Sequence, residues 1–419
     1  MRPHVLVLHA WGEPYAEYDS YIDHKRYAVS YICSEPAQAT VPGGAAAVAI
    51  TRLDDPAAVL CAARALIARL GNPERVVALR EYELIAAGEL RAEFGVPGDR
   101  PADLDRFRDK LIMGECVDAA GIPAPACAEA PDTPAILAFG EAHGWPVIVK
   151  PRLGASSRDV IRIDTPAQAR SLTEPATEPR LVQSFCPDPI LHIHGLWDGD
   201  RLDGWHAHRY LTNCLDFAGG RAMASVGIDD PGLRERIAAF TVAVCTALSP
   251  GEPRIFHLEA FLGRGPNGDA RLRFLEIGAR AGGAELPFLW REVYGADLLR
   301  AACDLQMGRP PRLGEPDTGR IAGFLLVPVP GRKPATVRHA ELPPEVAHLP
   351  YWAGLPAPGS RIGGANYQDV GGRFRFAGNS SAEVEQAVLR TAAAYRLDCE
   401  PDEAPYRSTG SAAPIPQPA

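Results

Sequence analysis

Residues 147–157 read Val-Ile-Val-Lys-Pro-Arg-Leu-Gly-Ala-Ser-Ser, which predicts a buried strand that delivers Lys150 to a loop of small residues. Small residues let backbone N–H groups approach phosphate oxygens, and the lysine adds a positive point charge. The loop is not a Walker A motif, because the chain contains no G-x-x-x-x-G-K-[ST] sequence. The alternative interpretation is a lysine that ends an edge strand beside an ordinary turn.

Lysine is rare in this chain, which gives weight to each position that holds one. Of 43 basic residues, four are lysines, at positions 25, 110, 150 and 333. Lys110 falls on a predicted helix from about residue 104 to 120. A lysine on a surface helix is normally only solvated, but the preference for arginine elsewhere favours a functional role for Lys110.

Two glutamates lie inside otherwise apolar predicted strands. Glu259 is in the strand 255–262 and Glu276 is in the strand 271–277, and a Gly-Pro-Asn-Gly loop predicts that the two strands pair antiparallel. A carboxylate that faces a core is costly unless it is paired or bound to a metal. Two such groups suit a hard cation such as Mg²⁺, whereas the alternative is that both face solvent.

Arg280 precedes a glycine pair, Gly282 and Gly283, where the backbone can come close to a ligand. Its planar guanidinium suits a carboxylate or a phosphorylated carboxylate. The alternative is that Arg280 pairs with Glu276, four residues earlier.

Hydrophobic patterning predicts a small parallel α/β domain in the first hundred residues. A strand at 5–8 precedes a helix at 56–70, and a strand at 76–79 precedes a second helix that ends at residue 94. The segment 11–31 is left unassigned. Further along, the pattern predicts the helices 104–120, 136–143, 233–248, 286–307 and 382–395, a strand at 181–185, and a hairpin of strands 191–196 and 204–211. The Pro/Ser/Ala-rich end after residue 398 is predicted to be disordered.

Composition limits the class of protein. The chain of 419 residues is 46% hydrophobic and 23% charged with a net charge of −9, and no window clusters Lys and Arg. This argues against nucleic acid or an anionic membrane as the main partner. No apolar run approaches ~20 residues, no signal peptide is evident, and the nine cysteines form no C-x-x-C pair. We therefore expect a reduced, cytoplasmic protein.

The order of the motifs resembles the ATP-grasp enzymes, particularly the carboxylate–amine ligases of the L-amino acid ligase branch, which make dipeptides and related amides. The motifs are Asp109-Lys110, the Gly-Ile-Pro-Ala-Pro of residues 121–125, Val-Lys-Pro with its small-residue loop, a Gln-Ser-Phe strand, and Glu-x-x-x-Arg-x-Gly-Gly. The resemblance covers residues 104–310.

This resemblance implies an α/β (α+β) ATP-grasp fold. Its parts would be an N-terminal parallel α/β domain at 1–103, an ATP-grasp core at 104–310 with a lid subdomain at about 122–190, an antiparallel C-terminal lobe at 311–400 and a tail at 401–419.

The resemblance also implies roles for single residues, with ATP and one or two Mg²⁺ ions as cofactors. The residues expected to bind ATP are Lys110, Lys150, Gly154, Ser156, Ser157, Gln183, Ser184, Phe185 and His192. Glu259 and Glu276 would hold Mg²⁺, and the expected catalytic residues are Arg280, Lys150 and Ser156.

Two positions depart from the family pattern. Ile190 stands where the family commonly has an acidic residue on the ribose, for which Asp188 is a substitute to consider. Gly278 stands where the family often has asparagine, so a second Mg²⁺ is an open question.

Four histidines flank the Asp198-Gly199-Asp200 turn: His192, His194, His206 and His208. If that turn sets the register, all four point to one face of the hairpin. Zinc is disfavoured, because side chains along flat strands make a poor tetrahedron. We expect the face to line the nucleotide–substrate cleft, with His206 or His208 as a general base for an incoming amine.

The sequence thus predicts an ATP-dependent ligase that joins a small carboxylic acid to an amine, such as amino acids or small peptides, through an acyl-phosphate. A homodimer is common in the family. Two alternative functions are a biotin-carboxylase-like carboxylase and a non-catalytic nucleotide-binding relative. A dinucleotide binder ranks last, because the chain lacks a G-x-G-x-x-G motif after its first strand.

Overall fold

The computed structural model describes residues 2–401 except 14, 173–177, 213–214, 216, 218, 266, 312, 314–318, 332–333 and 364–368. The predicted tail beyond residue 401 lies outside the described residues. Disorder directly after residue 398 was a wrong prediction, because β19 (Arg396–Pro401) pairs with β15 (Ala335–Glu341). Among the helices described, none combines the length and apolarity that crossing a bilayer requires.

The N-terminal part is a four-stranded parallel sheet in the order β3-β2-β1-β4, as the predicted α/β domain requires. The strands are β1 (His4–His9), β2 (Ala28–Cys33), β3 (Ala47–Ile50) and β4 (Arg75–Ala78); the helices are α1 (Tyr18–Tyr21), a 3₁₀ helix (Glu35–Thr40), α2 (Pro56–Leu70) and α3 (Glu83–Phe94). The predictions of α2 and of the strands β1 and β4 are confirmed, whereas β2 and β3 were missed.

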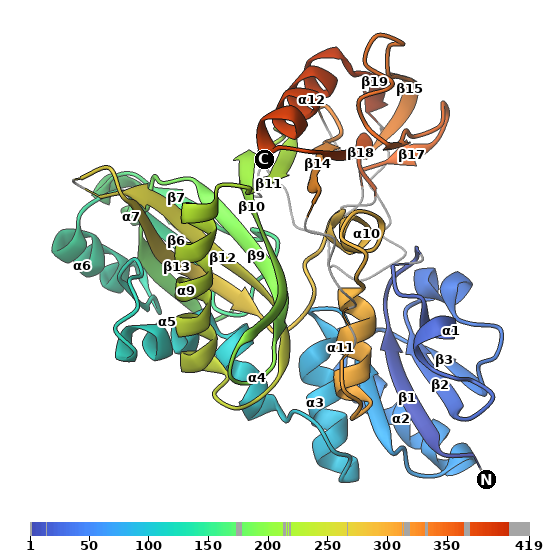
Figure 1. Ribbon diagram of the computed structural model, residues 1–419. Coiled ribbons are helices and arrows are strands. Elements are labelled where there is room, and N and C mark those ends of the chain that lie inside the picture. Colours follow the sequence, from blue (N-terminus) through green and yellow to red (C-terminus); the bar gives the residue numbers. More distant parts are fainter. Residues whose placement is uncertain are drawn as a thin grey trace.

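Strand β1 is buried on both faces, which explains its unbroken apolar run. Leu6 and Leu8 pack in a core with residues of α2 and α3. Val5 and Val7 pack on the other face in a core that includes Trp290. The second face is thus covered by a segment almost three hundred residues away in sequence, as the position of α11 (Leu298–Gln306) beside β1 shows (Figure 1).

The predicted helix 104–120 is two helices, α4 (Pro101–Arg108) and α5 (Lys110–Ala119). The break falls at Asp109, which has an extended backbone and whose carboxylate accepts a hydrogen bond from the Leu111 N–H at 2.9 Å. The same carboxylate binds the Arg152 guanidinium at 2.6 Å. Asp109 therefore caps α5 and places Lys110 at the start of that helix. Its contact with Arg152, which directly follows the strand of Lys150, joins the helix to that strand.

The predicted helix 286–307 is likewise divided, into α10 (Leu286–Glu292) and α11. Gly295 lies between them with φ of +69°, a conformation that ends an α-helix. Asp297 then caps α11 through the N–H groups of Leu299 and Arg300.

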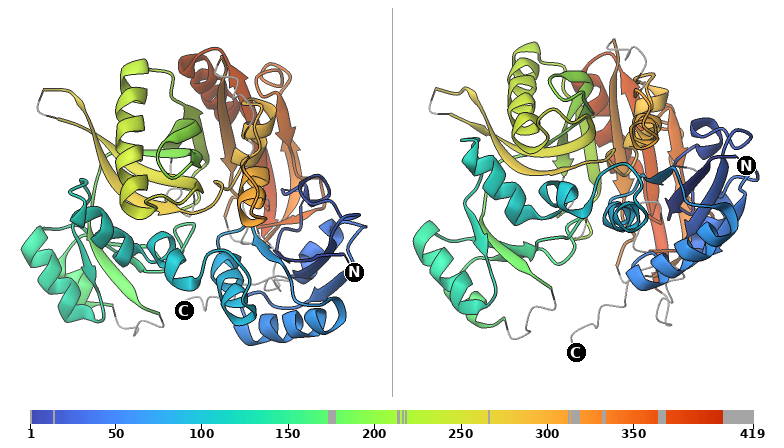
Figure 2. Two further views of the ribbon diagram at one scale, coloured as in Figure 1. Left: turned by 60° about the horizontal axis from the view of Figure 1, so that its bottom comes forward. Right: turned by 90° about the horizontal axis from the view of Figure 1, so that it is seen from below.

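A second sheet of four antiparallel strands, which we call the lid sheet, has the order β5-β8-β6-β7. Its elements are β5 (Cys127–Glu129), α6 (Thr133–His143), β6 (Val147–Pro151), β7 (Ile161–Ile163), α7 (Pro166–Arg170) and β8 (Arg180–Ser184). In Figures 1 and 2 the lid sheet and the N-terminal sheet lie at opposite ends of the molecule, with α4 and α5 between them.

The largest sheet has eight antiparallel strands in the order β13-β12-β9-β10-β11-β14-β18-β16. Its first part comprises β9 (Ile190–Trp197), β10 (Leu202–Thr212), β11 (Met223–Gly227), β12 (Arg254–Arg264) and β13 (Ala270–Gly278), with helix α9 (Pro231–Leu248). The predicted hairpin β9–β10 and the predicted pair β12–β13 are both confirmed.

The residues after 320 continue this central sheet and add a smaller one. They form β14 (Ile321–Val327), β15, β16 (Trp352–Gly354), β17 (Arg361–Ile362), β18 (Gly372–Gly378), α12 (Ser381–Ala394) and β19. Strands β14, β18 and β16 extend the eight-stranded sheet, and β17-β15-β19 form a separate three-stranded sheet.

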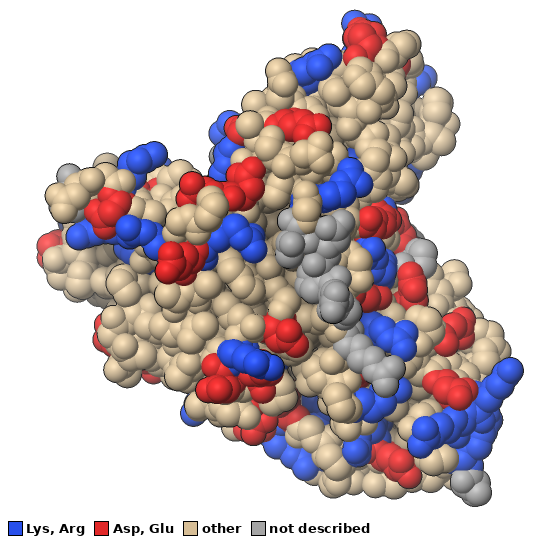
Figure 3. Space-filling model, viewed as in Figure 1, with Lys and Arg blue, Asp and Glu red and all other residues tan. Residues whose placement is uncertain are grey.

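Charged side chains of both signs are interspersed on the face shown in Figure 3. The Arg64–Glu93 contact is one of the exposed ion pairs among the described residues. Pairs of this kind contribute little to stability.

A fully buried carboxylate, Glu285, joins α10 to the central sheet. Its two oxygens each accept a hydrogen bond at 2.6 Å, one from the Arg373 Nε and one from the Arg375 Nε, both on β18. Arg373 also reaches Glu13, and Arg375 reaches Glu292. Breaking a buried pair by removing one partner is far more costly than losing an exposed pair.

We therefore expect Glu285→Gln to lower the free energy of unfolding by about 3 kcal/mol, because two buried guanidinium groups lose their shared counter-charge. Urea and thermal unfolding would measure the change. Glu93→Gln, which removes an exposed ion pair, is the control and should cost less than about 1 kcal/mol. Equal effects of the two substitutions would contradict a stabilising role for Glu285.

Candidate functional site

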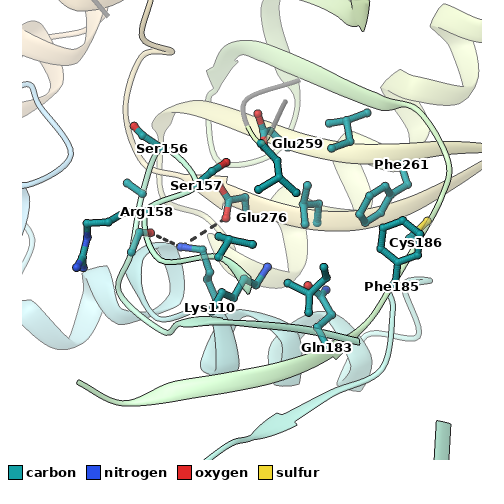
Figure 4. A pocket seen from close by; sticks show the side chains of 18 of the residues that line it. Lys110, Ser156, Ser157, Arg158, Gln183, Phe185, Cys186, Glu259, Phe261 and Glu276 are labelled. Atoms are coloured by element: carbon teal, nitrogen blue, oxygen red, sulfur yellow. Dashed lines mark hydrogen bonds and ion pairs between the residues drawn. The ribbon is translucent and has the colours of Figure 1, made fainter. Parts of the chain in front are cut away.

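A cavity lies between the lid sheet and the β12–β13 end of the central sheet (Figure 4). Its lining includes every residue expected at the ATP or metal site except His192: Lys110, Lys150, Gly154, Ser156, Ser157, Gln183, Ser184, Phe185, Glu259 and Glu276. Of the expected catalytic residues, Arg280 lies outside the lining. The sequence motifs thus converge on one place, although they come from four strands, a loop and a helix.

Two lysines and a glutamate form the charged end of the cavity. The Lys110 ammonium donates a hydrogen bond to the Gly154 carbonyl and lies 3.4 Å from the Glu276 carboxylate. Burial lowers the pKa of Lys150 to about 8, although the nearby Glu276 opposes that shift. Burial alone would raise the pKa of Glu276, but Lys110 and Lys150 bring it below its usual value. With Glu259, which also lines the cavity, this end gathers two cations and two carboxylates.

Glu259 and Glu276 face each other directly in the register of β12 and β13. Glu259 accepts a hydrogen bond from the Tyr210 hydroxyl at 2.9 Å. Carboxylate oxygens are the ligands that Mg²⁺ prefers, so the residues present fit this ion.

The loop after β6 carries three non-glycine residues in the left-handed region, with φ of 55° at Ser156, 56° at Ser157 and 55° at Asp159. Such backbone conformations are costly and cluster at ligand-binding loops. The side chains of both serines are drawn at the rim of the cavity in Figure 4. The predicted small-residue loop therefore has a strained backbone of the kind found in ligand-binding loops.

Strand β8 and the residue after it supply the other end of the cavity, through Gln183 and Ser184 on the strand and Phe185 beyond it. The Arg162 guanidinium lies over the Phe185 ring, 4.3 Å from its centroid. Asp188 and Ile190 also line the cavity. The Asp188 carboxylate already accepts a hydrogen bond from Arg273, so its use at a ribose would require that ion pair to be shared.

Arg280 is held by a residue that the sequence reasoning missed. The Glu81 carboxylate accepts hydrogen bonds from both Arg280 and Arg108, and the Arg108 guanidinium also donates to the Leu153 carbonyl at 3.1 Å. Burial would raise the pKa of Glu81, but the two arginines lower it to about 2. The predicted alternative partner, Glu276, is not the residue that binds the Arg280 guanidinium.

Gly278 makes room for this carboxylate. A Cβ at position 278 would lie 3.1 Å from the Glu81 Oε2, closer than most real contacts. Glu81 thus occupies the space, two residues beyond Glu276, that a side chain at 278 would need. The sequence did hold a signal for Glu81, because it follows the buried strand β4 closely. Parallel sheets bind their ligands at the carboxyl ends of their strands, where an acidic residue is a candidate for a functional role.

The four hairpin histidines share one face, as predicted, since His206 pairs with His194 and His208 with His192. That face does not line the cavity. His206 stacks on Tyr294 at 3.5 Å between ring centroids, and the His208 Nε2 lies 3.1 Å from the Tyr294 hydroxyl. Burial lowers the pKa of both His206 and His208 to about 3. The expectation of a cleft-lining face is therefore corrected, because α10 and the segment after it cover these rings.

No protein-family model matches the chain. Solved structures resemble it over nearly its whole length. An L-amino acid ligase from Bacillus licheniformis aligns with a TM-score of 0.72 at 17% identity, covering 95% of this chain and 98% of that one. An N5-carboxyaminoimidazole ribonucleotide synthetase from Thermotoga maritima gives 0.66 at 14% identity, covering 95% and 99%.

A third structure is the biotin carboxylase domain dimer of the 2-oxoglutarate carboxylase from Hydrogenobacter thermophilus, in complex with Mg-ADP and bicarbonate. It gives a TM-score of 0.65 at 12% identity and covers 96% of this chain and 91% of that one. The chain therefore has the ATP-grasp fold of carbon–nitrogen ligases and related carboxylases.

Curated relatives match shorter segments. An L-arginine-specific L-amino acid ligase of Bacillus subtilis is 32% identical over 91 residues, which is 22% of each chain. The large chain of carbamoyl phosphate synthase from Beutenbergia cavernae is 29% identical over 126 residues, which is 26% of this chain. The matches span 22% and 11% of the lengths of these two relatives.

The lowered pKa of Lys150 predicts a pH dependence of nucleotide binding. Above pH 8 the free protein has lost part of the Lys150 proton, and a bound triphosphate would restore it. Proton uptake on ATP binding should therefore approach one proton at pH 9 and be small at pH 7. Because binding requires this uptake, the affinity for ATP should fall as the pH rises. Calorimetry in buffers of different ionisation enthalpy measures this uptake. Lys150→Met should remove the difference between the two pH values, and uptake independent of pH in the unaltered protein would contradict the prediction.

Proposed function

We propose that this protein is an ATP-dependent ligase that joins a carboxylic acid to an amine through an acyl-phosphate, with release of ADP and phosphate. The observation that carries the proposal is the convergence of Lys110, Lys150, Glu259 and Glu276 at one end of the cavity. The similarity to two L-amino acid ligases favours amino acids or small peptides as substrates.

In the first step, a substrate carboxylate would attack the terminal phosphate of ATP. Lys110 and Lys150 would neutralise the phosphate oxygens, and the loop of Ser156 and Ser157 would hold them through its N–H groups and hydroxyls. Glu259 and Glu276 would bind Mg²⁺, which neutralises and orients the triphosphate when it is bound. Positioning and charge neutralisation are most of what phosphoryl transfer requires of a protein.

In the second step, an amine would attack the acyl carbon and phosphate would leave. We assign Arg280 to the developing negative charge of this step. Burial works against its charge, but Glu81, Glu276 and Glu259 raise the pKa of Arg280, so it stays protonated near both proposed metal ligands. Closure of the loop over the cavity would keep water from the acyl-phosphate.

The test is to follow ADP and phosphate release from Mg-ATP with amino acids offered singly and in pairs. We expect release that requires a particular acid–amine pair and falls at least about 100-fold in Lys150→Met and Glu276→Gln, because each removes a group aimed at the transferred charge. Lys25→Met, which changes an exposed lysine, is the matched control and should leave the rate unchanged.

Other outcomes would redirect the proposal. Release that depends on bicarbonate alone would indicate a carboxylase, as in the third similar structure. ATP binding without release for any pair would indicate a non-catalytic nucleotide-binding relative.

The position of Glu81 generates a separate prediction about the second step. Glu81→Gln keeps the shape of the side chain but removes the charge that holds Arg280, so amide formation should fall at least about tenfold. ATP affinity should change much less, because Glu81 does not line the cavity. Rates with saturating ATP, together with binding by calorimetry, separate the two effects. Equal losses of affinity and rate would argue for a merely structural role.

A further inference from the structure

Three imidazoles converge behind the cavity on two neighbouring strands. His192 and His194 lie on β9, and His257 lies on β12 directly opposite His194 in the register. One ring nitrogen of each of the three residues lies within 4.8 Å of those of the other two. None of the three residues lines the cavity described above.

The rings are not arranged as side chains along a flat ladder. The His192 and His194 ring planes are inclined by 53°, and those of His194 and His257 by 78°. The third ring comes from β12 rather than from β10, and the tilted rings bring one nitrogen of each residue within 4.8 Å of the other two.

The outer nitrogen of one ring is held in the way that metal-binding histidines are usually held. The His192 Nε2 lies 2.5 Å from the Ser225 hydroxyl, and its Nδ1 shares a hydrogen bond with the His194 Nε2 at 2.5 Å, which a bound ion would replace. The His257 Nε2 lies 3.7 Å from the Glu259 carboxylate, beyond hydrogen-bond distance. The Nδ1 atoms of His194 and His257 have no hydrogen-bond partner among the described residues. Buried polar atoms without partners are costly, so these two indicate a missing ligand.

Gly282 lies against the two unpartnered nitrogens. A Cβ at this position would lie 3.1 Å from the Nδ1 atoms of both His194 and His257, and 2.6 Å from the Leu286 Cδ1. Glycine is therefore the residue that lets the backbone pass this close to the two imidazoles.

The three residues have the chemistry of a transition-metal site rather than of a magnesium site. His192 and His194 are fully buried, and burial together with the neighbouring histidines lowers the pKa of both well below the usual range. Neutral imidazole is the form that binds metals. Imidazole nitrogens favour Zn²⁺ and similar ions, whereas Mg²⁺ favours oxygen.

We propose that His192, His194 and His257 form a binding site for a divalent transition-metal ion of the Zn²⁺ class. The site is distinct from the carboxylate pair Glu259 and Glu276, and it does not depend on the ligase proposal.

The test uses the full-length protein, freed of metal by a chelator and titrated with Co²⁺ in excess Mg²⁺. We expect one equivalent to bind with the intense visible absorption of a four-coordinate site, and Zn²⁺ to displace it. His194→Gln should abolish the absorption. Ser225→Ala removes only the group that orients His192, a milder change to the fold, and should weaken Zn²⁺ binding by about 10-fold or more in calorimetry.

His206→Gln is the matched control, because His206 is also buried and also has an unpartnered ring nitrogen but lies outside the trio. Its binding of Co²⁺ should equal that of the unaltered protein. Absence of the absorption in the unaltered protein would overturn the proposal. Binding that persists in full in His194→Gln would also overturn it, since the ion would then be held by other histidines.

Discussion

The buried ion pairs of Glu81 connect the parts of the molecule that form the site. Glu81 follows a strand of the N-terminal sheet, Arg108 ends α4, and Arg280 follows β13. Arg108 extends the connection to the loop after β6 through the Leu153 carbonyl. Buried ion pairs contribute little net stability, so the consequence of this network is geometric. It fixes Arg280 with respect to the loop that is proposed to hold the phosphates.

The charged groups of the site are paired to different degrees. Lys110 lies beside Glu276, and both lysines lower the pKa of that carboxylate. The balance is incomplete at Lys150, whose buried ammonium is held at a lowered pKa of about 8. A group of this kind gains from a polyanion, because the incoming charge replaces the water that burial removed. The same reasoning explains why the two opposed glutamates suit a cation.

Local sequence predicted much of the fold and missed specific elements for physical reasons. The helix α2 was predicted because its apolar residues recur at helical spacing and Gly71 ends it, and both signals are local. The strands β2 and β3 were missed, because β2 has Ser30 and Tyr31 within its apolar run and β3 is only four residues long. The helices at 104–120 and 286–307 were predicted as continuous, since apolar spacing continues through the breaks. Asp109 at the first break caps α5, and Arg152, which is distant in sequence, binds the same carboxylate.

The sequence by itself determined the strand, lysine and small-residue loop at 147–157, and the two glutamate strands joined by a turn. These depend on backbone periodicity and on short connections, which sequence expresses directly. Only the tertiary structure decided that Arg280 binds Glu81, 199 residues away, and that Gly278 leaves room for it. Only the structure brought His257 to His192 and His194 while α10 covered the hairpin face. Contacts of this kind depend on strand register and on the packing of distant segments, and no local pattern encodes either.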